Sequence, residues 1–168
     1  MLIRPEEPKD YEAIYAVNVA AFETPAEADL VSLLRKEADP TISLVAEEDG
    51  AIAGHIMFSP ASLAGHTELK IMGLGPMAVI PTQQRKGIGS RLVKAGLESC
   101  RGLGYGAVIV LGHTGFYPRF GFTPSVDFGI ECEYDVPKEA FMVMELLPGY
   151  LAEAHGIIKY HPAFNNVS

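Results

Sequence analysis

Hydrophobic and polar positions follow two different periods along this chain, and the changes of period predict its elements. Apolar residues spaced three and four apart predict helices over residues 10–22, 25–38 and 85–101. Short runs rich in β-branched residues predict strands at 2–4, 42–47, 51–58, 71–80, 107–111 and 141–146, with one more strand beginning near Gly121. The length of 168 residues suits a single domain over residues 1–168.

The first two predicted helices are defined by different signals. In the first, apolar side chains at helical spacing predict one buried face, formed by Tyr11, Ile14, Tyr15, Val19 and Phe22. In the second, Thr24 is a favourable N-cap residue, Pro25 suits the first helical position, and Glu27 follows the cap by three residues. These three residues predict a capping box at the start of the second helix.

Residues 42–80 predict three antiparallel strands. Asp49-Gly50 is typical of a hairpin turn between the first two strands, and a polar, glycine-containing loop is predicted at Ser59–Thr67. The run Ala107–Leu111 is wholly apolar, as in a strand that is buried on both faces. From Pro148 onwards we expect a tail, whose aromatic residues pack either on their own domain or on a partner.

Composition narrows the classes of function. The net charge of −8 argues against a nucleic acid as the main partner, because phosphate backbones require clustered Lys and Arg. No apolar run approaches the roughly 20 residues that span a bilayer, and we expect no signal peptide at the N-terminus. Cys100 and Cys132 are the only cysteines and lie in no metal-binding pattern. We therefore expect free thiols in a cytoplasmic protein, and no metal site.

The segment from Met77 to Leu92 carries the clearest candidate chemistry. An apolar strand ends near Pro81, a basic turn with two glycines follows at Gln84–Gly89, and helical spacing continues from there. Free N–H groups at such a helix start bind phosphates, and glycine allows an anion to approach the backbone closely. The turn lacks the Gly-Lys-Ser/Thr ending of nucleotide P-loops and the third glycine of the dinucleotide fingerprint. On these residues alone, a phosphate site and an ordinary strain-relieving turn are both open.

Two motifs together resemble one known family. Gln84-x-x-Gly87-x-Gly89 is similar to the coenzyme A pyrophosphate loop of the GNAT N-acetyltransferases, although Gln84 stands where that loop often begins with Arg. After one helix and one short strand, the hexapeptide Tyr117–Phe122 matches the Tyr-x-x-x-Gly-Phe motif of the family's second half. Segments at 74–79, 112–122 and 156–164 look like the small bacterial branch that is labelled YhbS-like predicted acetyltransferases.

This resemblance implies an α/β (α+β) fold with a mixed, mostly antiparallel sheet of about six to seven strands, flanked by helices. Strands four and five would splay apart and admit the pantetheine arm of the coenzyme. Residues 1–38 would supply the first strand and the acceptor-side helices. Residues 42–104 would supply the antiparallel strands and the CoA-binding helix, and residues 107–168 the C-terminal half and tail.

The resemblance also implies the chemistry. Acetyl-CoA would be the co-substrate, no metal would be needed, and an amine would attack the acetyl carbonyl directly in a ternary complex. Tyr117 would be the catalytic acid that protonates the departing thiolate. The implied cofactor-binding residues are Met77, Ala78, Val79, Gln84, Arg85, Lys86, Gly87, Ile88, Gly89 and Ser90.

Several alternatives are open at this level. Glu27 and His113 are the candidates for binding the acceptor, and the candidate bases are Glu27, Glu47, Glu68, His55, His66 and His113. The acceptor is a small molecule or a peptide, and a longer acyl group or an alcohol acceptor is an alternative. A CoA-binding sensor or regulatory module without catalysis is another. We expect a monomer or homodimer with neither nucleic acid nor membrane as a partner.

Overall fold

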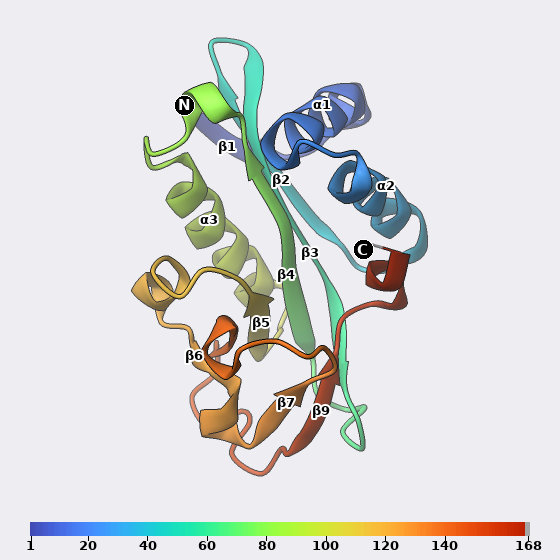
Figure 1. The fold of residues 1–168 in the computed structure, drawn as a ribbon, viewed down its shortest axis with the longest axis vertical. Coiled ribbons are helices and arrows are strands. Elements are labelled where there is room, and N and C mark those ends of the chain that lie inside the picture. The colour runs from blue at the N-terminus through green and yellow to red at the C-terminus, as the bar shows by residue number, and fades with distance from the viewer. Residues whose placement is uncertain (167–168) are drawn as a thin grey trace.

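The computed structural model describes residues 1–166 and contains, in that part of the chain, nine strands and three α-helices (Figure 1). The helices are α1 (Tyr11–Phe22), α2 (Ala26–Glu37) and α3 (Ile88–Gly102). The strands are β1 (Leu2–Pro5), β2 (Ile42–Glu48), β3 (Ala51–Leu63), β4 (Ile71–Val79), β5 (Ala107–Leu111), β6 (Thr123–Pro124), β7 (Ile130–Cys132), β8 (Phe141–Glu145) and β9 (Gly156–Lys159). Among these residues, no helix has both the length and the apolar character needed to cross a membrane.

One mixed sheet forms the centre of the fold, with the strand order β1-β2-β3-β4-β5-β8-β6. Neighbouring strands are antiparallel except for β4 and β5, which run parallel and are joined by α3 as a crossover helix. β7 and β9 pair with each other, and β9 joins the end of β3. The predicted α/β (α+β) fold with a mostly antiparallel sheet and flanking helices is therefore confirmed.

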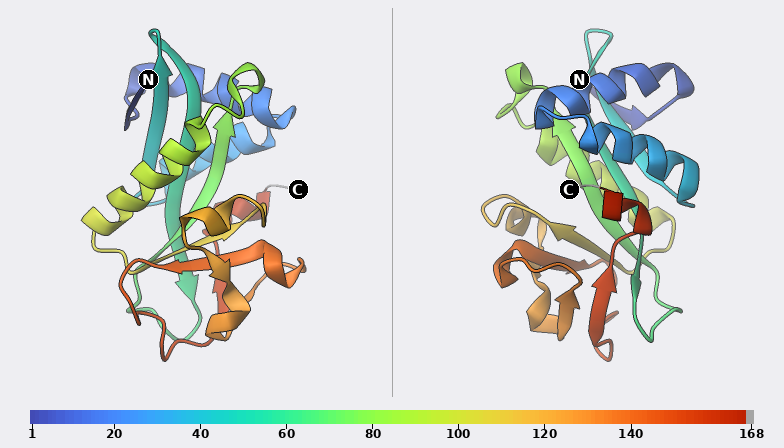
Figure 2. Two further views of the ribbon diagram at one scale, coloured as in Figure 1. Left: turned by 90° about the vertical axis from the view of Figure 1, so that its left-hand side faces the viewer. Right: turned by 45° about the vertical axis from the view of Figure 1, so that its right-hand side comes forward.

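The helices lie on both faces of the sheet. α1 and α2 cover one face and α3 covers the other, as Figures 1 and 2 show from several sides. Successive side chains of a strand point to opposite faces, so β2 contributes to both cores. Leu44 and Ala46 pack in the cluster that includes α3, whereas Val45 packs in the cluster that includes α1 and α2.

The buried face of α1 differs from the predicted one. Its buried residues are Ile14, Val17 and Asn18. The predicted aromatic positions of that face are instead 38–40% exposed: Tyr11, Tyr15 and Phe22. Asn18 can occupy the interior because its amide donates to the Ile14 carbonyl at 3.0 Å and lies 3.3 Å from Nδ1 of His55. A paired polar side chain thus takes a core position that an apolar pattern cannot reveal.

The start of α2 also differs from the prediction. The helix begins at Ala26 with Pro25 as its N-cap residue. The Thr24 hydroxyl lies 3.5 Å from the Glu27 carboxylate and does not cap the backbone. The predicted capping box is therefore wrong, and the Glu27 side chain is not held by the backbone of its own helix start.

The C-terminal region contains more structure than the pattern predicts. β9 lies within the predicted tail after Pro148. β3 continues into the predicted loop at Ser59–Thr67, where it pairs with β4 up to Ala61 and with β9 at Ser62 and Leu63. Two short strands, β6 and β7, stand where one strand was predicted. Tyr160 and Phe164 pack against each other with ring centroids 4.5 Å apart, among core residues of the same chain.

Candidate functional site

β4 and β5 part at one point in the sheet. They pair in parallel up to Leu74 and Val110, and among the described residues no pair joins them beyond that point. Just after Leu74 the register between β3 and β4 shifts, so β4 carries one extra residue before Met77. Such a β-bulge bends the strand that carries it. A fork between two parallel strands results, as the resemblance implies.

A pocket of about 1180 Å³ occupies this fork. Its walls come from parts of the chain that are distant in sequence. They are the second half of β4, the turn before α3, the end of β5 with the turn that follows, the junction of α1 and α2, and several C-terminal aromatic residues. The pocket exists only because the sheet brings these segments to one place.

The turn before α3 has the geometry of an anion site. Gly87 is the N-cap residue of α3 at a φ of 85°, a left-handed value that glycine adopts without strain. The first intrahelical bond runs from the Arg91 N–H to the Gly87 carbonyl at 3.1 Å. The N–H groups of Ile88, Gly89 and Ser90 precede that bond and have no intrahelical acceptor. Together with the positive end of the helix dipole, they have the arrangement that binds phosphates in proteins.

Side chains of this turn differ in position. The Gln84 amide donates to the Val79 carbonyl at 3.0 Å and ties the turn to the end of β4. Arg85 has a φ of 66° and lines the pocket. Lys86 borders a neighbouring hollow instead, and its ammonium group lies 3.4 Å from the Gln83 amide oxygen. Of the two cations predicted here, only Arg85 therefore reaches the pocket.

Tyr117 faces the same pocket from the first position of the short 3-10 helix η3 (Tyr117–Phe120). Its ring is 7% exposed and meets the rings of Phe116 and Phe122 edge-on, with centroids 5.0 and 5.8 Å away. A Cβ atom on Gly112 would come within 2.4 Å of this ring, so the ring lies here because residue 112 is glycine. Burial raises the pKa of Tyr117 to about 12, which keeps its hydroxyl protonated at neutral pH.

Most of the predicted site residues line this one pocket, although they come from separate elements. They are Glu27, Met77, Ala78, Val79, Gln84, Arg85, Gly87, Ile88, Gly89, Ser90, His113 and Tyr117. Lys86 is the predicted residue that lies elsewhere. Glu27 is the only carboxylate among the described residues of the pocket wall. The structure brings these groups together, and their individual roles stay predictions.

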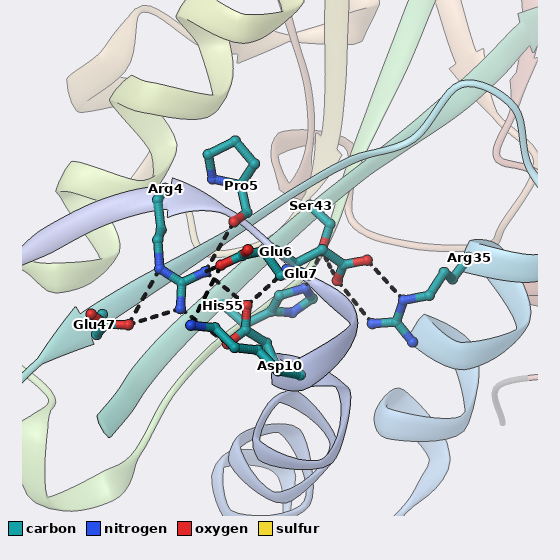
Figure 3. A network of polar contacts seen from close by, with 10 residues as sticks. Arg4, Pro5, Glu6, Glu7, Asp10, Arg35, Ser43, Glu47 and His55 are labelled. Carbon is teal, nitrogen blue, oxygen red and sulfur yellow. Dashed lines mark hydrogen bonds and ion pairs between the residues drawn. The ribbon is translucent and has the colours of Figure 1, made fainter. Parts of the chain in front are cut away.

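A buried polar network holds one of the other candidate bases (Figure 3). His55 is fully buried, with Nε2 2.8 Å from the Ser43 hydroxyl and Nδ1 3.3 Å from the Asn18 amide. The Ser43 hydroxyl donates to Glu6, which pairs with Arg35 through two bonds of 2.8 and 2.9 Å. These contacts suit a neutral imidazole with its proton on Nε2. Burial lowers the pKa of His55 to about 4, so it is uncharged at neutral pH.

Glu47 belongs to the adjoining part of the same network. Its carboxylate accepts two bonds from Arg4, of 2.8 and 3.3 Å, and Arg4 also pairs with Asp10 at 2.7 and 3.0 Å. His66 and Glu68 lie 3.5 Å apart in the connection between β3 and β4. In the described part of the chain, none of these residues lines the pocket. Of the candidate bases, only Glu27 and His113 do.

Cys100 and Cys132 are free thiols, and neither belongs to the described wall of the pocket. Burial raises the pKa of Cys100 to about 12 and also raises that of Cys132. Both are therefore protonated at neutral pH, which makes them poor nucleophiles. Within residues 1–166, no three His, Cys, Asp or Glu side chains gather in a way that could hold a metal ion.

Aromatic residues of the pocket wall were missed by the sequence patterns. Phe22, Tyr134, Tyr160 and Phe164 all line it, and none of them was among the predicted site residues. One glycine carries a usable signal. A Cβ atom on Gly73 would come within 2.7 Å of the Tyr160 ring. A glycine inside a strand indicates that another group approaches the backbone closely, but it does not say which one.

Comparisons with known proteins show the family of this chain. A family model for the acetyltransferase (GNAT) domain matches residues 2–125. The chain is 37% identical over 166 residues to the uncharacterized N-acetyltransferase YhbS of Escherichia coli K12, a match that covers 98% of this chain and 99% of that protein. The crystal structure of Escherichia coli YhbS in complex with CoA matches with a TM-score of 0.91 at 36% identity, covering 98% of this chain and 91% of that chain. A GNAT family acetyltransferase from Brucella melitensis in complex with acetyl-CoA matches with a TM-score of 0.80 at 36% identity, covering 97% of each chain.

Proposed function

This chain belongs to the GNAT family of acetyltransferases, and on that premise we propose that it transfers the acetyl group of acetyl-CoA to a primary amine of a small molecule or peptide. One observation carries the proposal. A single pocket is lined by a helix start with unpaired N–H groups, a fork between parallel strands and a protonated tyrosine. These are the parts needed to hold a phosphate, an extended thioester arm and a leaving thiolate.

Acetyl-CoA would lie across the fork. Its pyrophosphate suits the N–H groups of Ile88, Gly89 and Ser90, and Arg85 adds positive charge in the pocket wall. The amides of its pantetheine arm can pair with the free edge of β4 over residues 77–79, as an added strand pairs with a sheet edge. The relatives from Escherichia coli and Brucella melitensis, whose structures hold CoA and acetyl-CoA, support this assignment.

The transfer would be a direct attack in a ternary complex. The amine nitrogen forms a bond to the acetyl carbon, and the C–S bond breaks so that its electron pair leaves with the sulfur. A backbone N–H of β4 would stabilise the negative charge that develops on the carbonyl oxygen. The protonated state of both cysteines and their positions outside the pocket favour direct attack over an acyl-enzyme intermediate.

Tyr117 would supply the proton that the leaving sulfur takes up. The hydroxyl stays protonated until charge develops beside it, because burial raises its pKa to about 12. The same desolvation raises the proton affinity of a thiolate in this pocket, which offsets the higher pKa of the tyrosine donor. The bound ammonium loses one proton before the attack, since only the neutral amine has a free electron pair, and the nitrogen loses a second proton as the amide forms. Glu27 and His113 are the side chains of the pocket wall that can accept a proton, and one of the two protons restores the Tyr117 hydroxyl. The products are an amide and the free thiol of CoA.

The acceptor would bind beside α1 and α2. As the only carboxylate in the described wall, Glu27 would attract an ammonium group, while Phe22 and Leu30 would contact apolar parts of the same molecule. The net charge of −8 also favours a cationic acceptor over an anionic one. A primary amine with an apolar body therefore suits this end of the pocket best.

Binding and turnover test the proposal in two steps. Calorimetry should show acetyl-CoA binding by the purified protein. Release of CoA thiol, corrected for hydrolysis, should then rise with at least one member of a panel of amines, amino acids, polyamines, aminoglycosides and short peptides. Binding without an acceptor-dependent rate would indicate a sensor or regulatory module, and absence of binding would reject the proposal.

Glu27→Gln sharpens the test of the acceptor end. With an accepted amine, we expect KM for the amine to rise about fivefold, on the scale of one lost ion pair, with KM for acetyl-CoA unchanged. Glu12→Gln is the matched control, because Glu12 is an exposed carboxylate of α1 outside the pocket wall. An equal effect of both variants would show that only the overall charge matters.

A further inference from the structure

The hydroxyl of Tyr160 bridges the two strands where the fork opens. It accepts the Leu111 N–H at 3.0 Å and lies 3.4 Å from the Leu74 carbonyl, to which it donates. Leu74 and Val110 form the last residue pair between β4 and β5, and Leu111 is the next residue along β5. The hydroxyl therefore takes the place where the next hydrogen bond between the strands would form.

The ring of Tyr160 is fixed in this position. It is 7% exposed, it packs on Phe164, and it passes so close to Gly73 of β4 that a Cβ atom there would come within 2.7 Å. The same ring lines the pocket. Burial raises the pKa of Tyr160, so the hydroxyl stays protonated and can donate and accept at once. A tightly packed side chain thus joins both strands at the wall of the pocket.

We propose that Tyr160 is a positioning residue that sets the width of the fork, and thereby prepares the pocket for the pantetheine arm of acetyl-CoA. This inference rests on the proposed function, because it assumes that the arm enters between β4 and β5. Tyr160 acts through the two strands and takes no part in the transfer itself.

The reason lies in the two backbone groups that the hydroxyl satisfies. Without it, the buried Leu74 carbonyl and the partly buried Leu111 N–H are left unpaired, which costs free energy. The strands can then close on each other or admit water, and either arrangement differs from the fork in this structure. Acetyl-CoA would have to restore the open fork on binding. Its apparent affinity is therefore the intrinsic affinity multiplied by the fraction of molecules whose fork is open.

A second tyrosine offers a matched control at the opposite end of the same two strands. The Tyr150 hydroxyl accepts the Lys70 N–H at 2.7 Å, directly before β4. A Cβ atom on Gly106, directly before β5, would come within 2.4 Å of the Tyr150 ring. Tyr150 thus repeats the contacts of Tyr160, a ring on a glycine and a hydroxyl on a backbone N–H, but it does not belong to the described wall of the pocket.

The experiment compares Tyr160→Phe with Tyr150→Phe by calorimetry on two probes. Acetyl-CoA spans the fork and the phosphate site, whereas 3′-phospho-ADP is the part of coenzyme A without the pantetheine arm. In Tyr160→Phe we expect the Kd of acetyl-CoA to rise about tenfold, the scale of a buried group that loses its hydrogen bond. The Kd of 3′-phospho-ADP should stay within about twofold in both variants, as should that of acetyl-CoA in Tyr150→Phe.

A second pair of variants tests the ring instead of the hydroxyl. In Gly73→Ala the added methyl group displaces the Tyr160 ring, while the tyrosine keeps its hydroxyl. Gly106→Ala displaces the Tyr150 ring in the same way. We expect only Gly73→Ala to weaken the binding of acetyl-CoA while leaving the binding of 3′-phospho-ADP unchanged. This pair decides the question if Tyr160→Phe does not fold.

The outcomes separate this inference from the proposed function. If the unmodified protein binds no acetyl-CoA, the proposed function fails. If the unmodified protein binds acetyl-CoA, and Tyr160→Phe and Gly73→Ala each bind it as tightly as the unmodified protein does, the positioning role of Tyr160 is rejected. Equal weakening of both probes would likewise reject it, because a general loss of structure does not distinguish the pantetheine arm from the phosphates.

Discussion

Two regions of the molecule differ in how their polar groups are paired: the polar network beneath α1 and α2, and the pocket at the fork. In the network, Arg35, Glu6, Ser43 and His55 each bond to another member, and each side chain faces a partner of complementary charge or hydrogen-bonding character (Figure 3). One acceptor of this network, the Asn18 side-chain oxygen, is left without a partner among the described residues. In the pocket, by contrast, a helix start presents N–H groups without intrahelical acceptors.

This difference separates groups that hold the fold from groups that are available to a ligand. A buried polar group that is paired within the protein contributes to stability, and it has no remaining capacity for a substrate. A polar group that faces a cavity without a protein partner retains that capacity. The comparison therefore predicts that changes in the network affect stability, whereas changes in the pocket affect binding or turnover.

Tyr117→Phe should have the largest effect on the pocket side. We expect turnover of an accepted amine to fall by a factor on the order of 10² or more, about 2.7 kcal/mol in the barrier, because the variant keeps the ring and removes the proton donor. Acetyl-CoA affinity and the melting temperature should change little. The measurement is the steady-state rate at saturating acetyl-CoA, with affinity from calorimetry.

The pH profile adds a second check on Tyr117. Since burial raises the pKa of this hydroxyl to about 12, its ionisation should cause no decline in the rate below about pH 11. Phe120→Leu, which alters an aromatic residue of the same short helix, is the packing control. If Tyr117→Phe turns over at the normal rate, water or another residue protonates the sulfur.

His55 should give the largest effect on the network side, in stability and not in turnover. Its pKa is about 4 in the folded protein and about 6.5 when unfolded, so the unfolded state binds more protons below neutral pH. The contribution of His55 to the free energy of unfolding is therefore fully present above pH 7 and is lost as the pH drops from 7 towards 4. Below pH 4 this group causes no further change. Between pH 7 and 5 we expect a loss of about 2 kcal/mol.

Urea unfolding at several pH values measures this loss. His55→Gln should remove most of the dependence between pH 7 and 5, and His66→Gln, in the connection between β3 and β4, should leave it unchanged. The lowered pKa values of Glu6, held down by Arg35, and of Asp10, held at about 2 by Arg4, predict a further loss below about pH 4. An unchanged slope in His55→Gln would assign the acid sensitivity to other groups.

Gly89→Asp should have the smallest effect of the three and should act on binding alone. A Cβ atom at Gly89 would meet only ordinary contacts, 3.5 Å from Met77, so the fold should tolerate it. The added carboxylate would repel a pyrophosphate at the start of α3. We expect acetyl-CoA affinity to fall at least about tenfold, or about 1.4 kcal/mol, by calorimetry.

Two controls separate charge from bulk at this site. Gly89→Ala adds the Cβ atom without charge and should weaken binding less than Gly89→Asp does. Gly102→Asp adds the same charge at the other end of α3, where a Cβ atom meets nothing within 4 Å, and should leave affinity within about twofold. Normal acetyl-CoA affinity in Gly89→Asp would show that the pyrophosphate does not bind at this turn.

The sequence by itself determined those features that depend on neighbouring residues. The basic glycine turn at Gln84–Gly89 is one, because Gly87 provides the left-handed N-cap and the helix that follows leaves its first N–H groups free. The motif at Tyr117–Phe122 is another, since the short helix and the glycine after it are local. The antiparallel strands around Asp49-Gly50 follow for the same reason, as a two-residue turn pairs adjacent segments.

Only the tertiary structure decided which side chains share the pocket. His55 and Glu47 stood beside His113 among the candidate bases, but long-range partners hold them in the network. Tyr160 reaches the fork because β9 joins the end of β3 and carries the chain back across β4. Contacts between segments far apart in sequence depend on the whole sheet, and no local pattern of hydrophobic and polar residues records them.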